Sequence, residues 1–219
     1  TAYPPEDLVL KPALQEDARE AVEALARDTV SGPAILIGAP WVEEGRLYNA
    51  MLLLEGGAIA AITRKVDLPN YGVFDEKRVF APGPPPAPIT VRGVKLGVPV
   101  CEDIWTPPVC AALAAAGAEI LLVPNGSPFE AGKEDVRRDL ARARVRETGL
   151  PLIYCNQLGG QDELVFDGAS FVLNADGAVA AELPGWVERV VITDWSRGAD
   201  GRWACTPGAI ATAESREAQ

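Results

Sequence analysis

A chain of 219 residues with 48% hydrophobic residues can bury one sizeable core, so one large domain is expected. The formal net charge of -11 argues against nucleic-acid binding, because a protein that binds the phosphate backbone needs a basic face. The apolar stretches are short and interrupted by polar or charged residues, so no membrane-spanning segment is expected. The sequence shows no basic segment followed by an apolar one at its start, so nothing in it indicates secretion.

The hydrophobic pattern predicts strands with interspersed helices. The predicted helices cover residues 12–29, 107–117 and 133–148. The predicted strands cover residues 34–39, 47–54, 58–63, 94–100, 119–124, 152–155, 165–173, 178–182 and 187–193. Residues 64–88 carry many prolines, glycines and charges and are expected to form a long functional loop. The mixture of hairpin and crossover spacings predicts an α/β fold with a mixed sheet.

The reactive residue types narrow the possible chemistry. The four cysteines show no CxxC pairing, which favours reduced thiols in the cytoplasm. The chain has no histidine, which excludes Ser-His-Asp and Cys-His nucleophile activation and argues against a zinc site. If the chain is a hydrolase, its base must therefore be a carboxylate or a lysine.

Cys101 is the candidate nucleophile. It follows the predicted strand 94–100 in the sequence GVPVCEDIW and precedes a short loop and a helix. A nucleophile on such a turn is held rigidly beside backbone N–H groups that can bind an oxyanion. The alternative is a small residue of the core. Cys110, Cys155 and Cys205 lack such a setting and are expected to be core or incidental residues.

Lys65 is the second candidate, at the end of the predicted strand 58–63 and the start of the long loop. There it would lie on the rim of an active site, stabilise a negative intermediate and favour a thiolate. The alternative is a solvated surface charge.

Several motifs together resemble one known family. They are YPPEDLVLKP, LPNYGVFDEKRVF, GVPVCEDIW, NGSPFEAGK and YCNQLGGQDELVFDGASFVL. These strings resemble the glutaminase domain of glutamine-dependent NAD+ synthetases, in the nitrilase (carbon–nitrogen hydrolase) superfamily. The resemblance covers residues 1–193 and implies a nitrilase-type α-β-β-α sandwich that forms homo-oligomers. Residues 194–219 would then be a linker or tail towards a synthetase domain.

The resemblance also implies a mechanism. Cys101 would attack the side-chain amide of glutamine, ammonia would leave, and water would resolve the thioester to glutamate. Lys65 and the backbone N–H of Glu102 would support the oxyanion. No cofactor is implied here, since ATP and Mg²⁺ would serve only the synthetase domain, which would use the ammonia to amidate deamido-NAD+.

By the same resemblance, five residues would hold the glutamine: Tyr3, Phe74, Glu102, Ser127 and Lys133. Glutamine offers an amino group that suits a carboxylate, a carboxylate that suits a cation or hydroxyl, and methylenes that suit an aromatic wall. Each residue also has a structural alternative. The two aromatic residues would only pack, Ser127 would cap a turn, and Lys133 would open the following helix.

The chain departs from the family pattern at its start. The family's catalytic glutamate lies just before the stretch that matches Thr1, so the chain as given is expected to be truncated and poorly active. Glu6 is misplaced to replace that base, whereas Glu76 would orient Lys65. Two rival functions stay open, a stand-alone nitrilase-type amidase acting on another small amide and a scaffold without catalysis.

Overall fold

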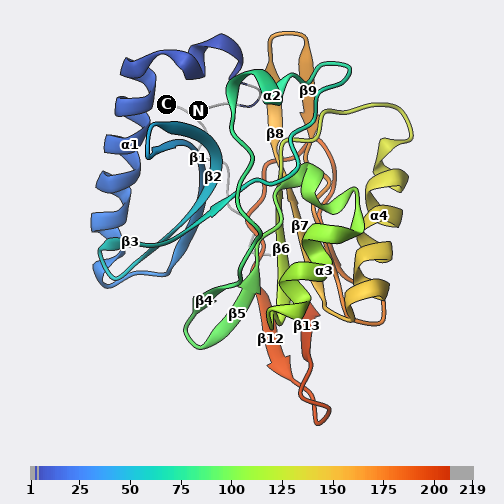
Figure 1. The fold of residues 1–219 in the computed structure, drawn as a ribbon. Coiled ribbons are helices and arrows are strands. Elements are labelled where there is room, and N and C mark those ends of the chain that lie inside the picture. The colour runs from blue at the N-terminus through green and yellow to red at the C-terminus, as the bar shows by residue number, and fades with distance from the viewer. Residues whose placement is uncertain (1–2, 4, 208–219) are drawn as a thin grey trace, which may run out of the picture. The chain divides into compact units, whose positions relative to one another are not determined.

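The computed structural model describes residue 3 and residues 5–207. The chain divides into two compact units, Thr1–Ala118 and Glu119–Gln219. Figure 1 shows the elements of both units in chain order, and each unit is described by itself below.

The α-helices are α1 (Pro12–Arg27), α2 (Glu76–Val79), α3 (Pro107–Ala115) and α4 (Lys133–Thr148). Three short 3₁₀ helices are η1 (Glu6–Leu10), η2 (Asp28–Val30) and η3 (Cys101–Ile104). The strands of the first unit are β1 (Ile35–Glu43), β2 (Arg46–Glu55), β3 (Ala58–Arg64), β4 (Ile89–Val91) and β5 (Val94–Gly97). The strands of the second unit are β6 (Ile120–Asn125), β7 (Leu152–Asn156), β8 (Leu158–Gln161), β9 (Leu164–Asp167), β10 (Phe171–Leu173), β11 (Val179–Glu182), β12 (Thr193–Arg197) and β13 (Trp203–Pro207).

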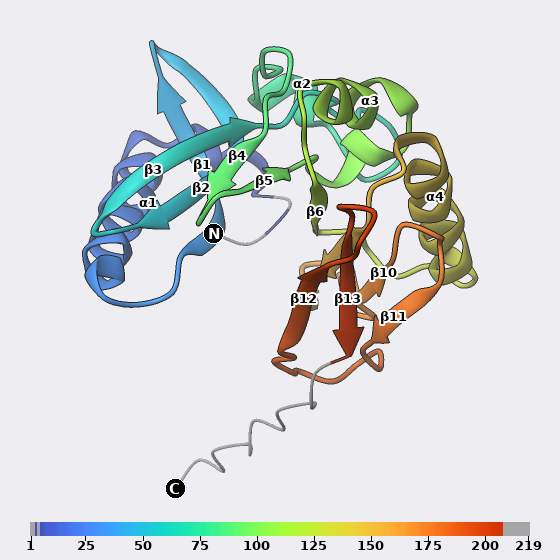
Figure 2. The same ribbon diagram turned by 90° about the horizontal axis from the view of Figure 1, so that it is seen from below.

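The first unit is built on an antiparallel meander of β1, β2 and β3. Helix α1 packs along this sheet, as Figure 2 shows. Alternate side chains of β2, Ala50, Leu52 and Leu54, join Val22 and Ala26 of α1 in one buried cluster. Because successive residues of a strand face opposite sides, Met51 and Leu53 are buried on the other face of the sheet. Burial on both faces explains why β2 reads as a nearly continuous apolar run.

The rest of the first unit carries the two candidate catalytic residues. Strand β3 ends one residue before Lys65, and β4 and β5 form an antiparallel hairpin. The hairpin leads through Val98, Pro99 and Val100 into η3, which begins at Cys101, and then into α3. Pro107 stands at the first turn of α3, where its missing N–H costs no helical hydrogen bond.

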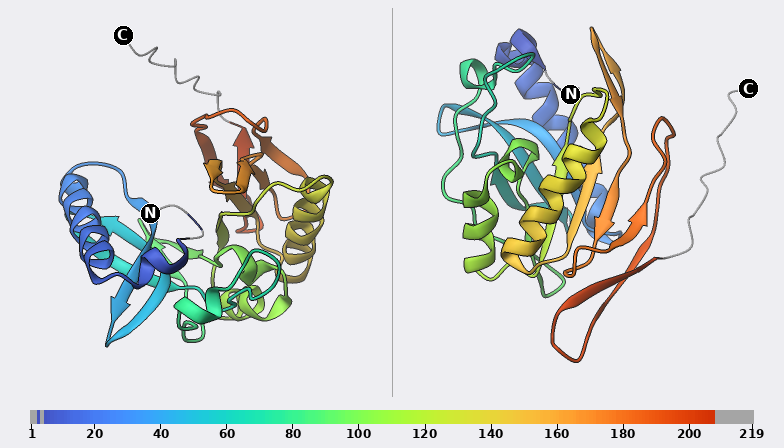
Figure 3. Two further views of the ribbon diagram at one scale, coloured as in Figure 1. Left: turned by 90° about the horizontal axis from the view of Figure 1, so that it is seen from above. Right: turned by 90° about the vertical axis from the view of Figure 1, so that its right-hand side faces the viewer.

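The second unit contains a mixed sheet in the strand order β11-β10-β7-β6. Strands β6 and β7 are parallel, with α4 as their crossover, whereas β10 pairs antiparallel with both β7 and β11. Helix α4 packs on β7 and β10, and Figure 3 shows it lying along this sheet. The expected α/β class with a mixed sheet is therefore confirmed.

The structure corrects several predicted boundaries. The predicted strand 165–173 is two strands, β9 and β10, separated by residues 168–170, where Gly168 forms an isolated β-bridge with Gly185. Residues 187–192 form no strand. The prediction of a tail from residue 194 is wrong for the first part, because β12 and β13 form an antiparallel hairpin that ends at Pro207. Asn174 fixes this hairpin by exchanging two hydrogen bonds with the backbone of Cys205. Residues 208–219 of the expected tail lie outside the described residues.

Candidate active site

Lys65 is buried rather than placed on a rim. It is 1% exposed, and its backbone continues the line of β3, with its N–H bonded to Asn49 O at 2.9 Å. Its C=O accepts from Gly83 N at 2.7 Å. A Cβ atom on Gly83 would approach Arg64 O to 2.6 Å, so a glycine is needed where the two segments meet. The expectation of a lysine on the rim is wrong, because the side chain is buried with its Nζ bonded to Glu76 Oε1.

Glu76 is the partner of Lys65. Its Oε1 accepts from Lys65 Nζ at 2.9 Å, from Tyr3 OH at 2.5 Å and from Asn49 Nδ2 at 3.3 Å. Glu76 is 3% exposed, and its Oε2 atom has no hydrogen-bond partner among the described residues. A buried ammonium group is thus fixed by a buried carboxylate, which is the orienting role expected of Glu76.

Two aromatic residues border this ion pair. The Tyr3 and Phe74 rings stack with their centroids 6.2 Å apart, and Lys65 Nζ lies 5.6 Å from the centroid of Tyr3. The pKa of Tyr3 is raised by burial and by the nearby negative charges of Glu76 and Cys101. The expected residues Tyr3, Lys65 and Phe74 therefore meet at one place, with Cys101 close enough to act on Tyr3 electrostatically.

Cys101 stands on a strained turn. Its φ angle is +48°, a left-handed conformation that few residues other than glycine adopt, and the residue is 8% exposed. Its neighbour Glu102 lies in the first turn of η3, where a backbone N–H finds no acceptor within its own helix. The strand predicted over residues 94–100 ends at Gly97, so Cys101 opens η3 after residues 98–100. Its role as the nucleophile and that of the Glu102 N–H as an oxyanion donor stay predictions.

Asp103 links two segments of the site. Its Oδ1 accepts from Val66 N at 3.1 Å and from Asp67 N at 2.7 Å, and its Oδ2 accepts from Val100 N at 2.8 Å. The N–H of Asp103 in turn donates to Val100 O at 3.1 Å. Burial raises the pKa of Asp103 to about 6, although these backbone N–H groups and Lys65 act in the opposite direction.

The raised pKa of Asp103 predicts how pH affects stability. The carboxyl group takes up a proton near pH 6 when folded and near its ordinary pKa of 3.8 when unfolded. Between these values the folded chain binds more protons, so lowering the pH from about 7 to about 4 should stabilise it by on the order of 3 kcal/mol relative to Asp103→Asn, which cannot titrate. Urea unfolding of both chains at the two pH values measures this. A difference between the two chains that stays constant with pH would contradict it.

Glu102 and Tyr71 form one wall of a pocket. Tyr71 OH donates to both carboxylate oxygens of Glu102, at 2.9 Å each. Burial raises the pKa of Glu102, and the Tyr71 hydrogen bond and Lys65 oppose this.

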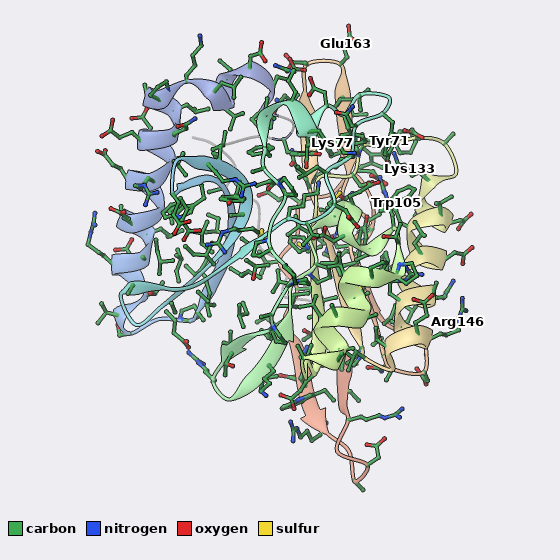
Figure 4. The ribbon with its side chains drawn as sticks, viewed as in Figure 1. Tyr71, Lys77, Trp105, Lys133, Arg146 and Glu163 are labelled. Atoms are coloured by element: carbon green, nitrogen blue, oxygen red, sulfur yellow. The ribbon has the colours of Figure 1, made fainter. Side chains whose placement is uncertain are left out.

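The pocket has a volume of about 710 Å³ and is lined by residues 66–71, Lys77, Phe80, Pro82, Glu102 and Thr106. Figure 4 labels Tyr71 and Lys77 on the segment that follows β3. The sequence reasoning missed Tyr71, although it lies in the motif LPNYGVFDE beside a predicted site residue.

Ser127 belongs to the second unit and is held by a buried network. Its N–H donates to Asn156 Oδ1 at 3.0 Å, and its Oγ accepts from Arg137 Nε at 3.1 Å. Arg137 also donates to the carbonyls of Ser127 and Pro128 and pairs with both oxygens of Asp167 at 2.8 Å. Because Ser127 Oγ already accepts a hydrogen bond, its hydroxyl hydrogen is left to donate.

Lys133 also belongs to the second unit and opens α4. Its Nζ donates to Glu130 Oε1 at 2.9 Å, and its N–H donates to Glu130 O at 3.1 Å. Lys133 therefore opens α4, as the structural alternative expects, and its charge is paired with an exposed carboxylate.

The other three cysteines have a different setting. Cys110 and Cys205 are buried, as expected of core residues, whereas Cys155 is exposed and is not a core residue. Burial raises the pKa of the thiols of Cys155 and Cys205. Both thiols are therefore poorer nucleophiles at neutral pH than an ordinary cysteine.

The described residues contain neither a metal-binding group of side chains nor a membrane-spanning helix. Within residues 3 and 5–207, no group of three or more His, Cys, Asp or Glu side chains could hold a metal ion. None of the helices in this part of the chain combines the length and apolar character that crossing a bilayer requires.

Comparison with known proteins gives consistent matches. The family model described as carbon-nitrogen hydrolase matches residues 4–204. A glutamine-dependent NAD(+) synthetase from Rhodobacter capsulatus is 54% identical over 210 residues, which are 96% of this chain and 38% of that protein. The solved glutamine-dependent NAD+ synthetase from Acinetobacter baumannii has a TM-score of 0.86 at 35% identity, covering 95% of this chain and 39% of that one.

A stand-alone enzyme is also similar. An amidase from Nesterenkonia sp. AN1 has a TM-score of 0.71 at 33% identity, with 83% of this chain and 71% of that chain covered. The chain thus spans well under half the length of the NAD+ synthetases and most of the amidase. These structural similarities confirm the expected nitrilase-type α/β fold.

Proposed function

Because the chain belongs to the carbon–nitrogen hydrolase family, we propose that it hydrolyses the side-chain amide of glutamine through a thioester on Cys101. The observation that carries the proposal is the buried Lys65–Glu76 ion pair, together with Cys101 on its strained turn. The high identity to glutamine-dependent NAD+ synthetases supports glutamine as the amide.

The reaction proceeds in two steps. The Cys101 sulfur attacks the amide carbon, and the developing oxyanion is stabilised by Lys65 Nζ and the Glu102 N–H. The hydrogen of the Cys101 thiol passes to the amide nitrogen, which leaves as ammonia when the C–N bond breaks and the thioester forms. Water then adds to the thioester carbon, the C–S bond breaks, and one hydrogen of the water returns to sulfur, which gives glutamate and the free thiol. Glu76 keeps the ammonium group of Lys65 in place, because the two are hydrogen-bonded out of contact with water. Amide hydrolysis of this kind uses no cofactor.

The residues proposed to hold glutamine divide by chemistry. The carboxylate of Glu102, oriented by Tyr71, suits the amino group, and Tyr3 and Phe74 offer aromatic surface for the methylenes. The Ser127 hydroxyl can donate a hydrogen bond, and Lys133 carries a cation that is paired with Glu130, so both residue types suit the glutamine carboxylate.

The names of the relatives support a longer reaction sequence. The ammonia would pass to a synthetase part of the same protein, which would amidate deamido-NAD+ with ATP and Mg²⁺. We also propose a cytoplasmic homo-oligomer, as the family resemblance implies. Size-exclusion chromatography with light scattering on the full-length gene product tests the assembly.

A second candidate is hydrolysis of another small amide, favoured by the similarity to the Nesterenkonia amidase, which was solved with acrylamide and fluoroacetamide adducts on its active-site cysteine. The ratio of kcat/KM for glutamine to that for propionamide separates the two functions. A ratio well above one supports the glutaminase, because only glutamine engages the polar residues proposed to bind it. A scaffold without catalysis would hydrolyse neither amide.

A glutamine-mimicking electrophile should label Cys101 selectively. Cys101 stands at the proposed attack site, whereas the Cys155 and Cys205 thiols have raised pKa values and Cys110 is fully buried. Peptide mapping by mass spectrometry after brief exposure measures the distribution of label. Predominant labelling at Cys155 or Cys205 would refute Cys101 as the nucleophile.

A further inference from the structure

The Asp103 side chain accepts hydrogen bonds from the backbone that follows Lys65 and from the backbone that precedes Cys101. The N–H groups of Val66 and Asp67, which follow Lys65, meet at its Oδ1. The N–H of Val100, which precedes Cys101, meets its Oδ2. The loop that leaves Lys65 and the segment of residues 98–100 that leads to Cys101 are therefore both hydrogen-bonded to one carboxylate.

This carboxylate is not explained as a stabilising ion pair. Asp103 is 1% exposed, and no ion pair within residues 3 and 5–207 includes it. Burial of its charge is the largest effect on its pKa and opposes the charged form that accepts all three N–H bonds. A buried charge held by backbone donors alone contributes little net stability, but it fixes geometry, because both oxygens accept from separate segments.

We propose that Asp103 is a positioning residue that holds Lys65 and Cys101 at their working separation. Its two oxygens set the distance between residues 66–67 and residue 100, and each catalytic residue is the immediate neighbour of one of these segments. Asp103 touches no substrate in this role. Displacement of a reacting group by about 1 Å can cost about a hundredfold in rate. Loss of the hydrogen bonds on either side of Asp103 should therefore slow the reaction while leaving Lys65 and Cys101 in the site. The consequence for glutamine hydrolysis rests on the proposed function, whereas the consequence for the reactivity of Cys101 does not.

The first test is alkylation of Cys101 by iodoacetamide in the Asp103→Asn variant. Asparagine has one acceptor oxygen and places an NH₂ group against the N–H groups on the other side, so half of the link is lost. Removing a nearby negative charge would, by electrostatics alone, favour the thiolate and speed the reaction. Loss of positioning predicts the opposite, a rate constant at Cys101 lower by at least about tenfold and a pH profile of labelling moved to higher pH.

A matched control separates positioning from lost stability. Leu54→Ala removes a fully buried side chain of β2 that lies in the α1 cluster, so it destabilises the first unit away from the site. Labelling of Cys101 in this variant should match the wild-type rate below its melting temperature. A rate in Asp103→Asn that equals or exceeds the wild-type rate would overturn the inference.

Amide hydrogen exchange of the wild-type chain provides a test that needs no variant. The N–H groups of Val66, Asp67 and Val100 should all exchange slowly, and exchange at the rate of an unprotected amide in any of them would overturn the inference.

In the full-length gene product, Asp103→Asn should lower kcat for glutamine at least about a hundredfold while KM changes less than about threefold. Slower alkylation in a protein that hydrolyses no glutamine would support the role of Asp103 and refute only the proposed function.

Discussion

In the full-length gene product, replacing Lys65 with alanine is expected to lower kcat for glutamine hydrolysis at least about a hundredfold, the scale of losing one oxyanion donor. The Lys65 ammonium group is buried, and its Nζ donates to Glu76 Oε1 at 2.9 Å. Burial strengthens its interaction with a developing negative charge, since little water screens it. Steady-state glutamate release per folded molecule measures the effect.

Stability must be measured with this variant, because Lys65 is not a surface residue. Removing it leaves the carboxylate of Glu76 buried and unpaired, which should cost about 3–5 kcal/mol of unfolding free energy. The double variant Lys65→Met with Glu76→Leu removes both charges and should recover much of that stability while staying inactive. Near-normal kcat in folded Lys65→Ala would show that the lysine has no part in catalysis.

In the second unit, Arg137→Met should lower the free energy of unfolding by about 3–5 kcal/mol, far more than the substitution of the neighbouring arginine. Arg137 is 2% exposed and donates to two carbonyls, to Ser127 Oγ and to both oxygens of Asp167. The substitution leaves Asp167, itself 3% exposed, as an uncompensated buried charge. Chemical unfolding of the chain measures the change.

The neighbouring residue Arg138 gives a matched control on the same helix. It pairs with Glu134 and Glu182, whose side chains are 51% and 47% exposed. Arg138→Met should therefore cost no more than about 1 kcal/mol. Equal losses at Arg137 and Arg138 would contradict a special role for the buried pair. Arg137→Met together with Asp167→Leu should be more stable than Arg137→Met alone.

The sequence predicts the position of Lys65 well, because β3 ends just before it where the apolar run stops. The strand predicted over residues 94–100 ends already at Gly97, so the apolar run before Cys101 does not mark a strand end. The burial of Lys65 was not predictable in the same way. It depends on Glu76, Tyr3 and Gly83, which come from other parts of the chain and have no local pattern that relates them to Lys65.

Buried polar networks escaped the sequence reasoning for the same reason. Arg137 lies among the many charges of α4 and reads as a solvated residue, yet it is buried because Asp167, far along the chain, neutralises it. Asp103 reads as one of two acids after Cys101, and its role depends on N–H groups on a different segment. The hairpin of β12 and β13 was missed because its alternation is short. Thr193 and Trp195 in β12, and Trp203 and Cys205 in β13, alternate with exposed residues, but each alternation spans too few residues to predict a strand.

The most direct measurement is the detection of a glutamyl adduct on Cys101 during turnover. The full-length gene product is mixed with glutamine, quenched in acid and digested, and the peptide containing Cys101 is examined by mass spectrometry. A thioester mechanism predicts that this peptide gains glutamine less ammonia, and that Cys101→Ala shows neither adduct nor glutamate release. Undiminished glutamate release from Cys101→Ala would contradict the assignment of Cys101 as the nucleophile.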